Sequence, residues 1–217
     1  MTKETMTVHE GLAELKILAS RIEKEIASSV YVNSNKHANT KIDGMSVEEY
    51  TEGMKSAYQK VVDLIKRRNA IKRAITKSNA VTDVTLTKSD GSIVTMTVAE
   101  LIEYKNVGLQ FTERLVNTIT KQYNTVTSLI KRQNDLINET ADKYVTGLYG
   151  GKDNTNKDVV ESTRTAYIEA NSQDLIDPNK IADRISELNA ELDFYNTKVD
   201  AALSTSNAVT VIEFEYW

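Results

Sequence analysis

The sequence predicts a mainly α protein, an antiparallel bundle or coiled coil of long helices with a small β-hairpin and a C-terminal strand. Helix breakers are rare, with one proline and eight glycines in 217 residues. Apolar residues recur at spacings of three and four over long segments, which places them on one face of a helix. We expect one domain over residues 1–217.

Helix starts are marked by capping chemistry. A Thr or Ser followed three residues later by Glu can form a capping box, and an acid before Pro suits the first turn of a helix. The three boxes begin at Thr7, Ser46 and Thr97, and the acid before proline is Asp177. Together with the apolar spacing, they predict helices near 7–28, 46–78, 97–144, 158–171 and 177–205. The third would be about 65 to 70 Å long.

Three short segments favour strands. Residues 81–88 and 92–97 are rich in Val and Thr and flank Asp90-Gly91, a dipeptide suited to a tight hairpin turn. The tail, residues 209–216, also carries β-branched and aromatic side chains.

The sequence Ser-Asn-Ala-Val-Thr occurs twice, at residues 78–82 and 206–210, and we call these the SNAVT segments. Each follows a predicted helix and leads into a predicted strand. We interpret them as twin helix-to-strand joints, with helices 46–78 and 177–205 side by side and their strands joined to the hairpin in one small sheet. The alternative is that a five-residue match is accidental.

Composition excludes several classes of site. Without cysteine there are no disulfides, Cys-type zinc sites, iron–sulfur clusters or thiol nucleophiles. A net charge of −4 does not favour nucleic acid as a partner. No segment reaches the roughly 18 consecutive apolar residues of a membrane span, and the start does not resemble a signal peptide. We therefore expect a protein of the cytoplasm with no membrane partner.

Sequence motifs give no catalytic set and no cofactor. The two histidines, His9 and His37, lack further metal ligands at a suitable spacing. There is no Gly-x-Ser-x-Gly motif and no phosphate-binding Walker loop. The glycine-rich stretch GLYGGKDN, from Gly147, could hold an anion by its backbone N–H groups, or it could be a surface turn.

The basic cluster KRRNAIKR, residues 66–73, is the first candidate ligand site. Arginine can hold a carboxylate or phosphate through two hydrogen bonds. We predict that Arg67, Arg68 and Arg73 bind a small anionic ligand. Arg67 is expected to lie away from Ile71 and Ile75, so that part of the cluster points to solvent. The alternative is ion pairing with acids of a neighbouring helix.

The second candidate is a polar face on the helix near 158–171. Arg164, Tyr167, Asn171 and Asp174 recur there at spacings of three and four. The first three could recognise a nucleotide or sugar through charge, stacking and hydrogen bonds. The alternative is a polar helix face packed on the bundle.

Two regions, 46–103 and 177–215, are similar to a family of small bacterial helical proteins known as septicolysin-like. The similarity rests on RRNAIKRAITKSNAVTDV, TVAELIEYKN and the late helix that begins DPNKIADRISELNAELDF. It implies helices that lead through an Asn-x-x-Thr step into β-structure. The pore-forming activity in the family name is not carried over, because no segment here would enter a membrane unaided. Richness in Asn, Lys and Tyr indicates a phage of low-GC Gram-positive bacteria.

A long helix with a heptad-like apolar stripe cannot bury that stripe alone, so self-association is expected. The sequence favours a non-enzymatic, homo-oligomeric binding or interaction protein. In its specific form, a phage-encoded protein captures a small nucleotide-like ligand between subunits in the host cytoplasm and so counters host defence. A virion or assembly component is the alternative, and an enzyme with an unrecognised site is the second alternative.

Overall fold

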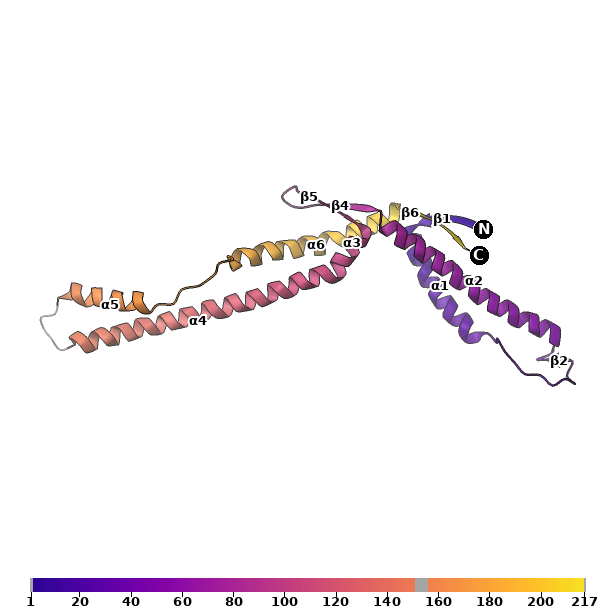
Figure 1. The fold of residues 1–217 in the computed structure, drawn as a ribbon, viewed down its shortest axis with the longest axis horizontal. Coiled ribbons are helices and arrows are strands. Elements are labelled where there is room, and N and C mark those ends of the chain that lie inside the picture. Colours follow the sequence, from indigo (N-terminus) through magenta and orange to yellow (C-terminus); the bar gives the residue numbers. More distant parts are fainter. Residues whose placement is uncertain (1, 151–155, 217) are drawn as a thin grey trace. The chain divides into compact units, whose positions relative to one another are not determined.

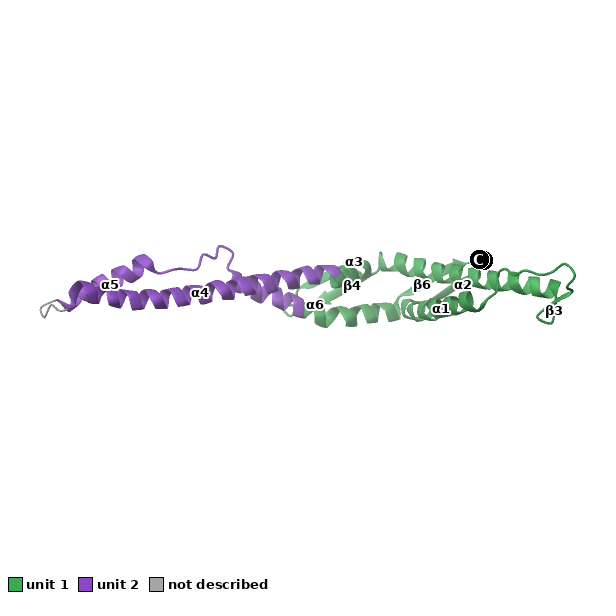
Figure 2. Ribbon diagram, turned by 90° about the horizontal axis from the view of Figure 1, so that it is seen from below, with its two compact units in different colours: residues 1–106, 194–217 green, residues 107–193 purple. Residues whose placement is uncertain are grey.

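The computed structural model describes residues 2–150 and 156–216, and it confirms a mainly α fold with small antiparallel strand pairs (Figure 1). The chain divides into two compact units, coloured separately in Figure 2. Unit 1 comprises residues 1–106 and 194–217, and unit 2 comprises residues 107–193. The single domain expected from the sequence stays a prediction.

Unit 1 contains a helical hairpin of α1 (Val8–Ser28) and α2 (Val47–Asn79), which pack side by side (Figure 1). Both helices begin where the capping boxes predict. Thr7 Oγ1 accepts the N–H of Glu10 at 3.2 Å, while Glu10 Oε2 accepts the N–H of Thr7 at 2.7 Å. The connection carries the short strands β2 (Lys41–Ile42) and β3 (Met45–Ser46), whose turn includes Gly44 at a φ of 84°.

The predicted hairpin follows α2 as β4 (Asp83–Thr87) and β5 (Ile93–Thr97). Next comes α3 (Val98–Glu103), then a π-helical turn, η1 (Tyr104–Gly108), and then α4 (Leu109–Tyr149). The helix predicted over 97–144 therefore continues to Tyr149 but contains one irregular turn. That turn ends at Gly108, the position where the composition of the predicted helix is interrupted.

Unit 2 contains α4, α5 (Lys157–Asn171) and the first part of α6 (Ile181–Val209). The expected helix start at Asp177 is wrong by four residues, because Pro178 lies in a turn and Lys180 has a φ of 52°. Asp177 still caps the helix from a distance, since its Oδ2 accepts the N–H of Ile181 at 2.7 Å. None of the helices in the described ranges is both long and apolar enough to cross a bilayer.

The C-terminal strand β6 (Val211–Tyr216) pairs antiparallel with an N-terminal strand, β1 (Thr2–Thr7). The prediction of one sheet shared with the hairpin is therefore wrong. β4–β5, β1–β6 and β2–β3 are separate two-stranded sheets in the described part of the chain. The sequence analysis assigned no strand before Thr7, so the partner of β6 was missed.

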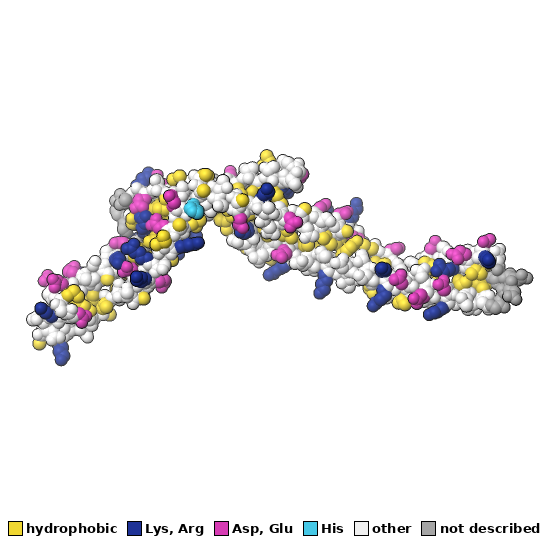
Figure 3. Space-filling view, turned by 180° about the vertical axis from the view of Figure 1, so that it is seen from behind, with side chains coloured by type: hydrophobic (Ala, Val, Ile, Leu, Met, Phe, Trp, Pro, Cys, Tyr) yellow, Lys and Arg dark blue, Asp and Glu magenta, His cyan; other side chains and the backbone are white. Residues whose placement is uncertain are grey.

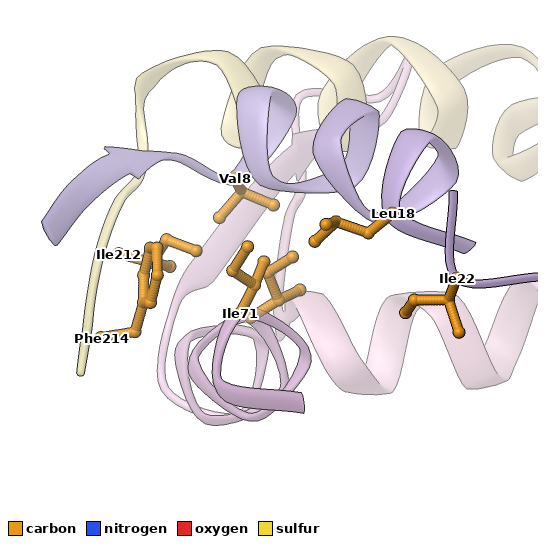
Figure 4. Packing of buried hydrophobic residues seen from close by; sticks show 7 residues of the cluster. Val8, Leu18, Ile22, Ile71, Ile212 and Phe214 are labelled. Carbon is orange, nitrogen blue, oxygen red and sulfur yellow. The ribbon is translucent and has the colours of Figure 1, made fainter. Parts of the chain in front are cut away.

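The strand β6 packs on α2 and contributes to the core of unit 1. Ile212 and Phe214 join Ile71 and Ile75 of α2 in a cluster that also includes Val8, Leu18 and Ile22 of α1 (Figure 4). Gly11 of α1 allows this helix to approach α2 closely, since a Cβ at position 11 would lie 3.2 Å from Ile75 Cδ1.

The SNAVT segments occupy equivalent places, as predicted. In the hairpin joint, which is residues 78–100, the N–H of Thr82 donates to the carbonyl of Ser78 at 2.9 Å. In the terminal joint, which is residues 2–10 and 206–216, the N–H of Thr210 donates to the carbonyl of Ser206, also at 2.9 Å. The interpretation of the two segments as equivalent helix-to-strand joints is confirmed, but their strands lie in separate sheets.

A second repeat completes each joint. Thr-Met-Thr-Val followed by Glu two residues later occurs at 5–10 and at 95–100, where each copy ends a strand and starts a helix. Val8 N–H donates to Thr210 O at 2.9 Å, and Val98 N–H donates to Thr82 O at 2.8 Å. The same hydrogen bond therefore links an SNAVT segment to a Thr-Met-Thr-Val repeat in both joints.

Candidate functional site

The best-formed candidate site is a groove between α2 and β6, beside the terminal joint in unit 1. Its volume is about 860 Å³. The residues of α2 that line it recur every three or four positions, which places them on one face of the helix. The lining residues are Lys66, Asn69, Ala70, Arg73, Ala74 and Lys77 of α2 and Glu213, Phe214, Glu215 and Tyr216 of β6.

The α2 wall of this groove is cationic. Lys66, Arg73 and Lys77 are exposed, and none of them forms an ion pair or side-chain hydrogen bond with the described residues. On the β6 wall, Glu213 is paired with Lys3 at 2.5 Å, and this hydrogen bond raises the pKa of Lys3. The groove therefore offers three positive charges that lack a carboxylate partner.

Arg67 lies at the edge of the groove and is about one-fifth exposed. Its guanidinium contacts Glu14 at 2.5 Å and Glu4 at 2.8 Å and donates to the hydroxyl of Tyr216 at 2.6 Å. It also stands 4.9 Å from the centre of the Tyr216 ring. Hydrogen bonding to Glu4 and then to Glu14 raises the pKa of Arg67, and the same bond from Arg67 lowers the pKa of Glu4.

The expectation that Arg67 lies away from Ile71 is wrong. The two residues are four positions apart, so a helix places them on the same face. Ile71 is fully buried in the α1–α2–β6 core, and Arg67 covers the edge of that core. For Arg67, the alternative of ion pairing with acids of neighbouring elements is the arrangement found.

The other two predicted arginines of α2 separate from Arg67. Arg73 lines the groove. Arg68 does not line it, and its Nη1 donates to Asn69 Oδ1 at 3.1 Å. Arg67, Arg68 and Arg73 therefore do not form one site, because they leave the helix in different directions.

The second predicted set lies in unit 2, where α5 packs on α4. Arg164 Nε pairs with Asp142 Oδ1 of α4 at 2.7 Å, and this hydrogen bond raises the pKa of Arg164. Tyr167 stacks on Tyr144 with ring centres 4.9 Å apart. Asn171 Nδ2 donates to the carbonyl of Tyr167 at 2.7 Å and is the last residue of α5, so Asp174 lies beyond the helix. These contacts match the alternative of a polar face packed on the bundle.

Several residues of the groove were not identified from the sequence. Lys66 belongs to the predicted basic cluster but was not among its predicted ligand residues, and Lys77 lies outside the cluster. Both belong to the same helical stripe as Arg73, and this spacing was a usable signal. The β6 wall had no such signal, because β6 follows α6 in the chain and yet packs on α2. The contribution of Glu215 and Tyr216 depends on tertiary structure.

The positions of α6 and β4 that superpose on the groove residues provide an internal comparison. When the two SNAVT segments are superposed, Lys66, Arg73 and Lys77 correspond to Phe194, Ala201 and Thr205. The acids of the other wall, Glu213 and Glu215, correspond to Thr85 and Thr87. The helix α6 therefore leads into an SNAVT segment with the same backbone hydrogen bond but without the three cations, and β4 follows an SNAVT segment without the two acids.

The remaining predictions concern an anion-binding loop and metal ligands. The proposed anion-binding stretch after Gly147 falls largely on residues 151–155, which lie outside the described residues. Within 2–150 and 156–216, no group of three His, Cys, Asp or Glu side chains could hold a metal ion.

Comparison with protein-family models, with curated proteins and with solved structures found no match to the chain. The septicolysin-like resemblance and the phage origin stay predictions.

Proposed function

We propose that the protein is a non-enzymatic, homo-oligomeric binding protein that holds a small anionic, nucleotide-like ligand in the α2–β6 groove. One observation supports this above the rest. Lys66, Arg73 and Lys77 line one wall without a carboxylate partner among the described residues, and the positions of α6 that superpose on them are uncharged.

The three cations form no ion pair with the described residues that would stabilise the fold. Arg73 and Lys77 are four residues apart on α2, where like charges repel and destabilise a helix by a few tenths of a kcal/mol. A bound phosphate would remove this repulsion. Arginine would hold it through two parallel hydrogen bonds, and the lysines would act as point charges.

The remaining lining groups suit the rest of a nucleotide-like molecule. Asn69 supplies an amide that both donates and accepts hydrogen bonds. Tyr216 supplies an aromatic ring on which a planar base can stack, and Glu215 can accept hydrogen bonds from sugar hydroxyls or an exocyclic amine. The chemistry is therefore that of a phosphorylated, ring-containing ligand.

Capture of a host signal by a phage-encoded protein in the host cytoplasm is the biological form of this proposal. The composition of the chain and the absence of a spanning helix in the described ranges support it. A binding protein acts by stoichiometry, so the ligand should be recovered chemically unchanged. A ligand that is altered during incubation would instead support the enzyme alternative.

The proposal is tested by calorimetric titration of the full chain with ATP, AMP, adenosine and inorganic phosphate. We expect ATP to bind, and adenosine, which lacks phosphate, to bind much more weakly. Arg73→Ala should weaken ATP binding by about tenfold or more, because a charge-assisted hydrogen bond contributes roughly 1.5 to 3 kcal/mol.

Arg68→Ala is the matched control, since it removes the same side chain from the same helix outside the groove. It should leave ATP affinity unchanged. No binding of any phosphate compound, or equal losses in Arg73→Ala and Arg68→Ala, would contradict the proposal. Circular dichroism of both variants checks that the helices are intact.

A virion or assembly component is the second candidate. It is favoured by the 41-residue helix α4, which leaves large apolar side chains exposed. Detection of the protein in purified particles at a fixed ratio to the other virion proteins would support it. Absence from particles, together with ATP binding, would support the binding protein.

A further inference from the structure

The long helix α4 has two apolar faces, and one is exposed. The inner face is buried at Val116, Ala141 and Val145. The outer face carries four large apolar residues whose exposed fractions are 64% for Phe111, 50% for Leu115, 41% for Leu129 and 50% for Leu136. Figure 3 shows hydrophobic side chains at the surface of the protein. Solvent exposure of four such residues along one helix is typical of an interaction surface.

The outer face has the spacing of a coiled-coil seam. Positions at alternating intervals of four and three from Phe111 to Leu136 correspond to the a and d positions of a heptad repeat, and the four apolar residues all fall on this frame. The other four positions are polar. We call the whole set the α4 stripe, and its members are Phe111, Leu115, Thr118, Gln122, Thr125, Leu129, Arg132 and Leu136. A seam of this kind fits a second helix of similar length and pattern.

Charges beside the α4 stripe indicate which helix packs on it. The positions that precede Leu115, Gln122 and Leu136 are Arg114, Lys121 and Asp135. They are basic towards the start of α4 and acidic towards its end, and in the described part of the chain no ion pair or side-chain hydrogen bond engages them. A copy of the same helix in the opposite direction is complementary to this pattern.

The relative direction of the two α4 helices follows from the charged positions. In a parallel pair, Arg132 would meet the same residue of its copy across a d layer, and like charges there are destabilising. In an antiparallel pair with Phe111 opposite the partner's Leu136, Thr118 faces the partner's Leu129. Arg114 then lies beside the partner's Asp135, and the stem of the partner's Arg132 covers Leu115.

We propose that the chain forms an antiparallel dimer in which the α4 stripe packs on the α4 stripe of a second copy. This deepens the oligomeric part of the proposed function and rests on it in that respect. The α4 stripe lies in unit 2 and the α2–β6 groove in unit 1. Loss of ATP binding and loss of dimerisation can therefore be measured separately.

The test measures the mass of the full chain by analytical ultracentrifugation over a range of concentrations. Wild type should sediment as a dimer, and Leu129→Glu should sediment as a monomer. Arg114→Glu and Asp135→Arg should each weaken dimerisation by about tenfold or more, because each dimer contains the pair twice. The double variant should recover most of the loss, which an effect on folding would not produce.

Ile17→Glu is the matched control, since Ile17 of α1 is 67% exposed and lies outside the α4 stripe. It should leave the dimer unchanged. Wild type that is monomeric at all concentrations would overturn the proposal, as would a double variant no better than the single ones. Helical circular dichroism equal to wild type confirms that each variant is folded.

The antiparallel direction of the two α4 helices is tested by disulfide cross-linking. The chain has no cysteine, so any disulfide must come from the introduced residues. A mixture of Thr118→Cys and Leu129→Cys chains should form a mixed disulfide under mild oxidation. Thr118→Cys alone should not cross-link, since its equivalent in the partner is about 16 Å away along the helix. Efficient cross-linking of Thr118→Cys alone would overturn the antiparallel arrangement.

Discussion

The hairpin joint and the terminal joint share their backbone hydrogen bonds but are held by different side chains. Superposing the repeats aligns Arg67 of α2 with Tyr195 of α6, and Glu14 of α1 with Tyr104 of η1. Arg67 lies beside the terminal joint through its bonds to Glu4 and Tyr216, and Tyr195 contacts Tyr104, which follows the hairpin joint in the chain. Arg67 and Glu14 form an ion pair at 2.5 Å, and the two tyrosines form an edge-to-face aromatic pair with ring centres 4.7 Å apart. One backbone plan therefore accommodates two kinds of contact at the same position.

This difference in side-chain contacts shows that two sets of residues have separate roles. The SNAVT segments and the Thr-Met-Thr-Val repeats determine where each helix ends, where each strand begins and how the two are linked. The contact between the paired helical residues determines how each joint responds to pH and to mutation. The amide of Val8 reports on the terminal joint and the amide of Val98 on the hairpin joint, because each donates to an SNAVT threonine.

The largest expected effect is in the hairpin joint. Tyr195 is 4% exposed, so Tyr195→Ala leaves a cavity beside Tyr104. Truncating a large aromatic side chain in a core costs about 3 to 5 kcal/mol. We expect native-state hydrogen exchange to show this loss at Val98 and a much smaller loss at Val8. Equal losses at the two amides would show that the joints open as one unit.

A smaller effect is expected from the corresponding change in the terminal joint. Arg67→Met keeps much of the packing on Phe214 and Tyr216 but removes the hydrogen bonds to Glu4 and Glu14. Charge-assisted hydrogen bonds contribute roughly 1.5 to 3 kcal/mol, so a loss of about 2 to 3 kcal/mol is expected at Val8. Val98 should be little affected. Protection of Val8 at the wild-type level would mean that the ion pair does not stabilise this joint.

The smallest effect is a difference in acid sensitivity. Hydrogen bonds from Arg67 and Tyr216 hold the pKa of Glu4 below its usual value of 4.5. A carboxylate whose pKa is lowered by folding stabilises the protein above the unfolded pKa, and this contribution is lost as the pH falls through the folded pKa. Protection of Val8 should therefore decrease as the pH falls below about 4.5.

The control for acid sensitivity is the Arg67→Met variant. Val8 should be less protected from exchange in this variant than in wild type, and the difference should shrink as the pH falls. The reason is that protonation of Glu4 removes the same interaction from wild type. The contact between the Tyr104 and Tyr195 rings contains no carboxylate, so we expect a weaker dependence on pH at Val98. A deficit at Val8 that is constant from pH 6 to pH 3 would exclude the ion pair as the cause.

Helix positions were largely predictable from the sequence. The capping boxes at Thr7, Ser46 and Thr97 placed three helix starts correctly, because each box is made within four consecutive residues. Asp177 misled the prediction of α6, since a positive φ at Lys180 separates the acid from the helix it caps. The SNAVT segments were identified as joints for the same local reason.

The candidate groove was predictable in part. Arg73 was recognised by its charge, and its neighbours at helical spacing on α2 could have been found in the same way. Arg67 was assigned to the wrong face of α2, although its four-residue spacing from Ile71 carried the correct information. The β6 wall could not be assigned to α2, because nothing near Glu215 in the chain specifies that helix.

The sequence by itself determined the helix starts, the hairpin turn and the two equivalent joints. These features depend on backbone capping, breaker residues and side-chain spacing, which act over a few residues. Tertiary structure decided that β6 pairs with β1, and that Arg67 is partly buried and ion-paired while Arg73 is exposed and has no ion pair with the described residues. The partners of Arg67 are 53, 63 and 149 residues away in the chain, and packing of the core alone brings them together.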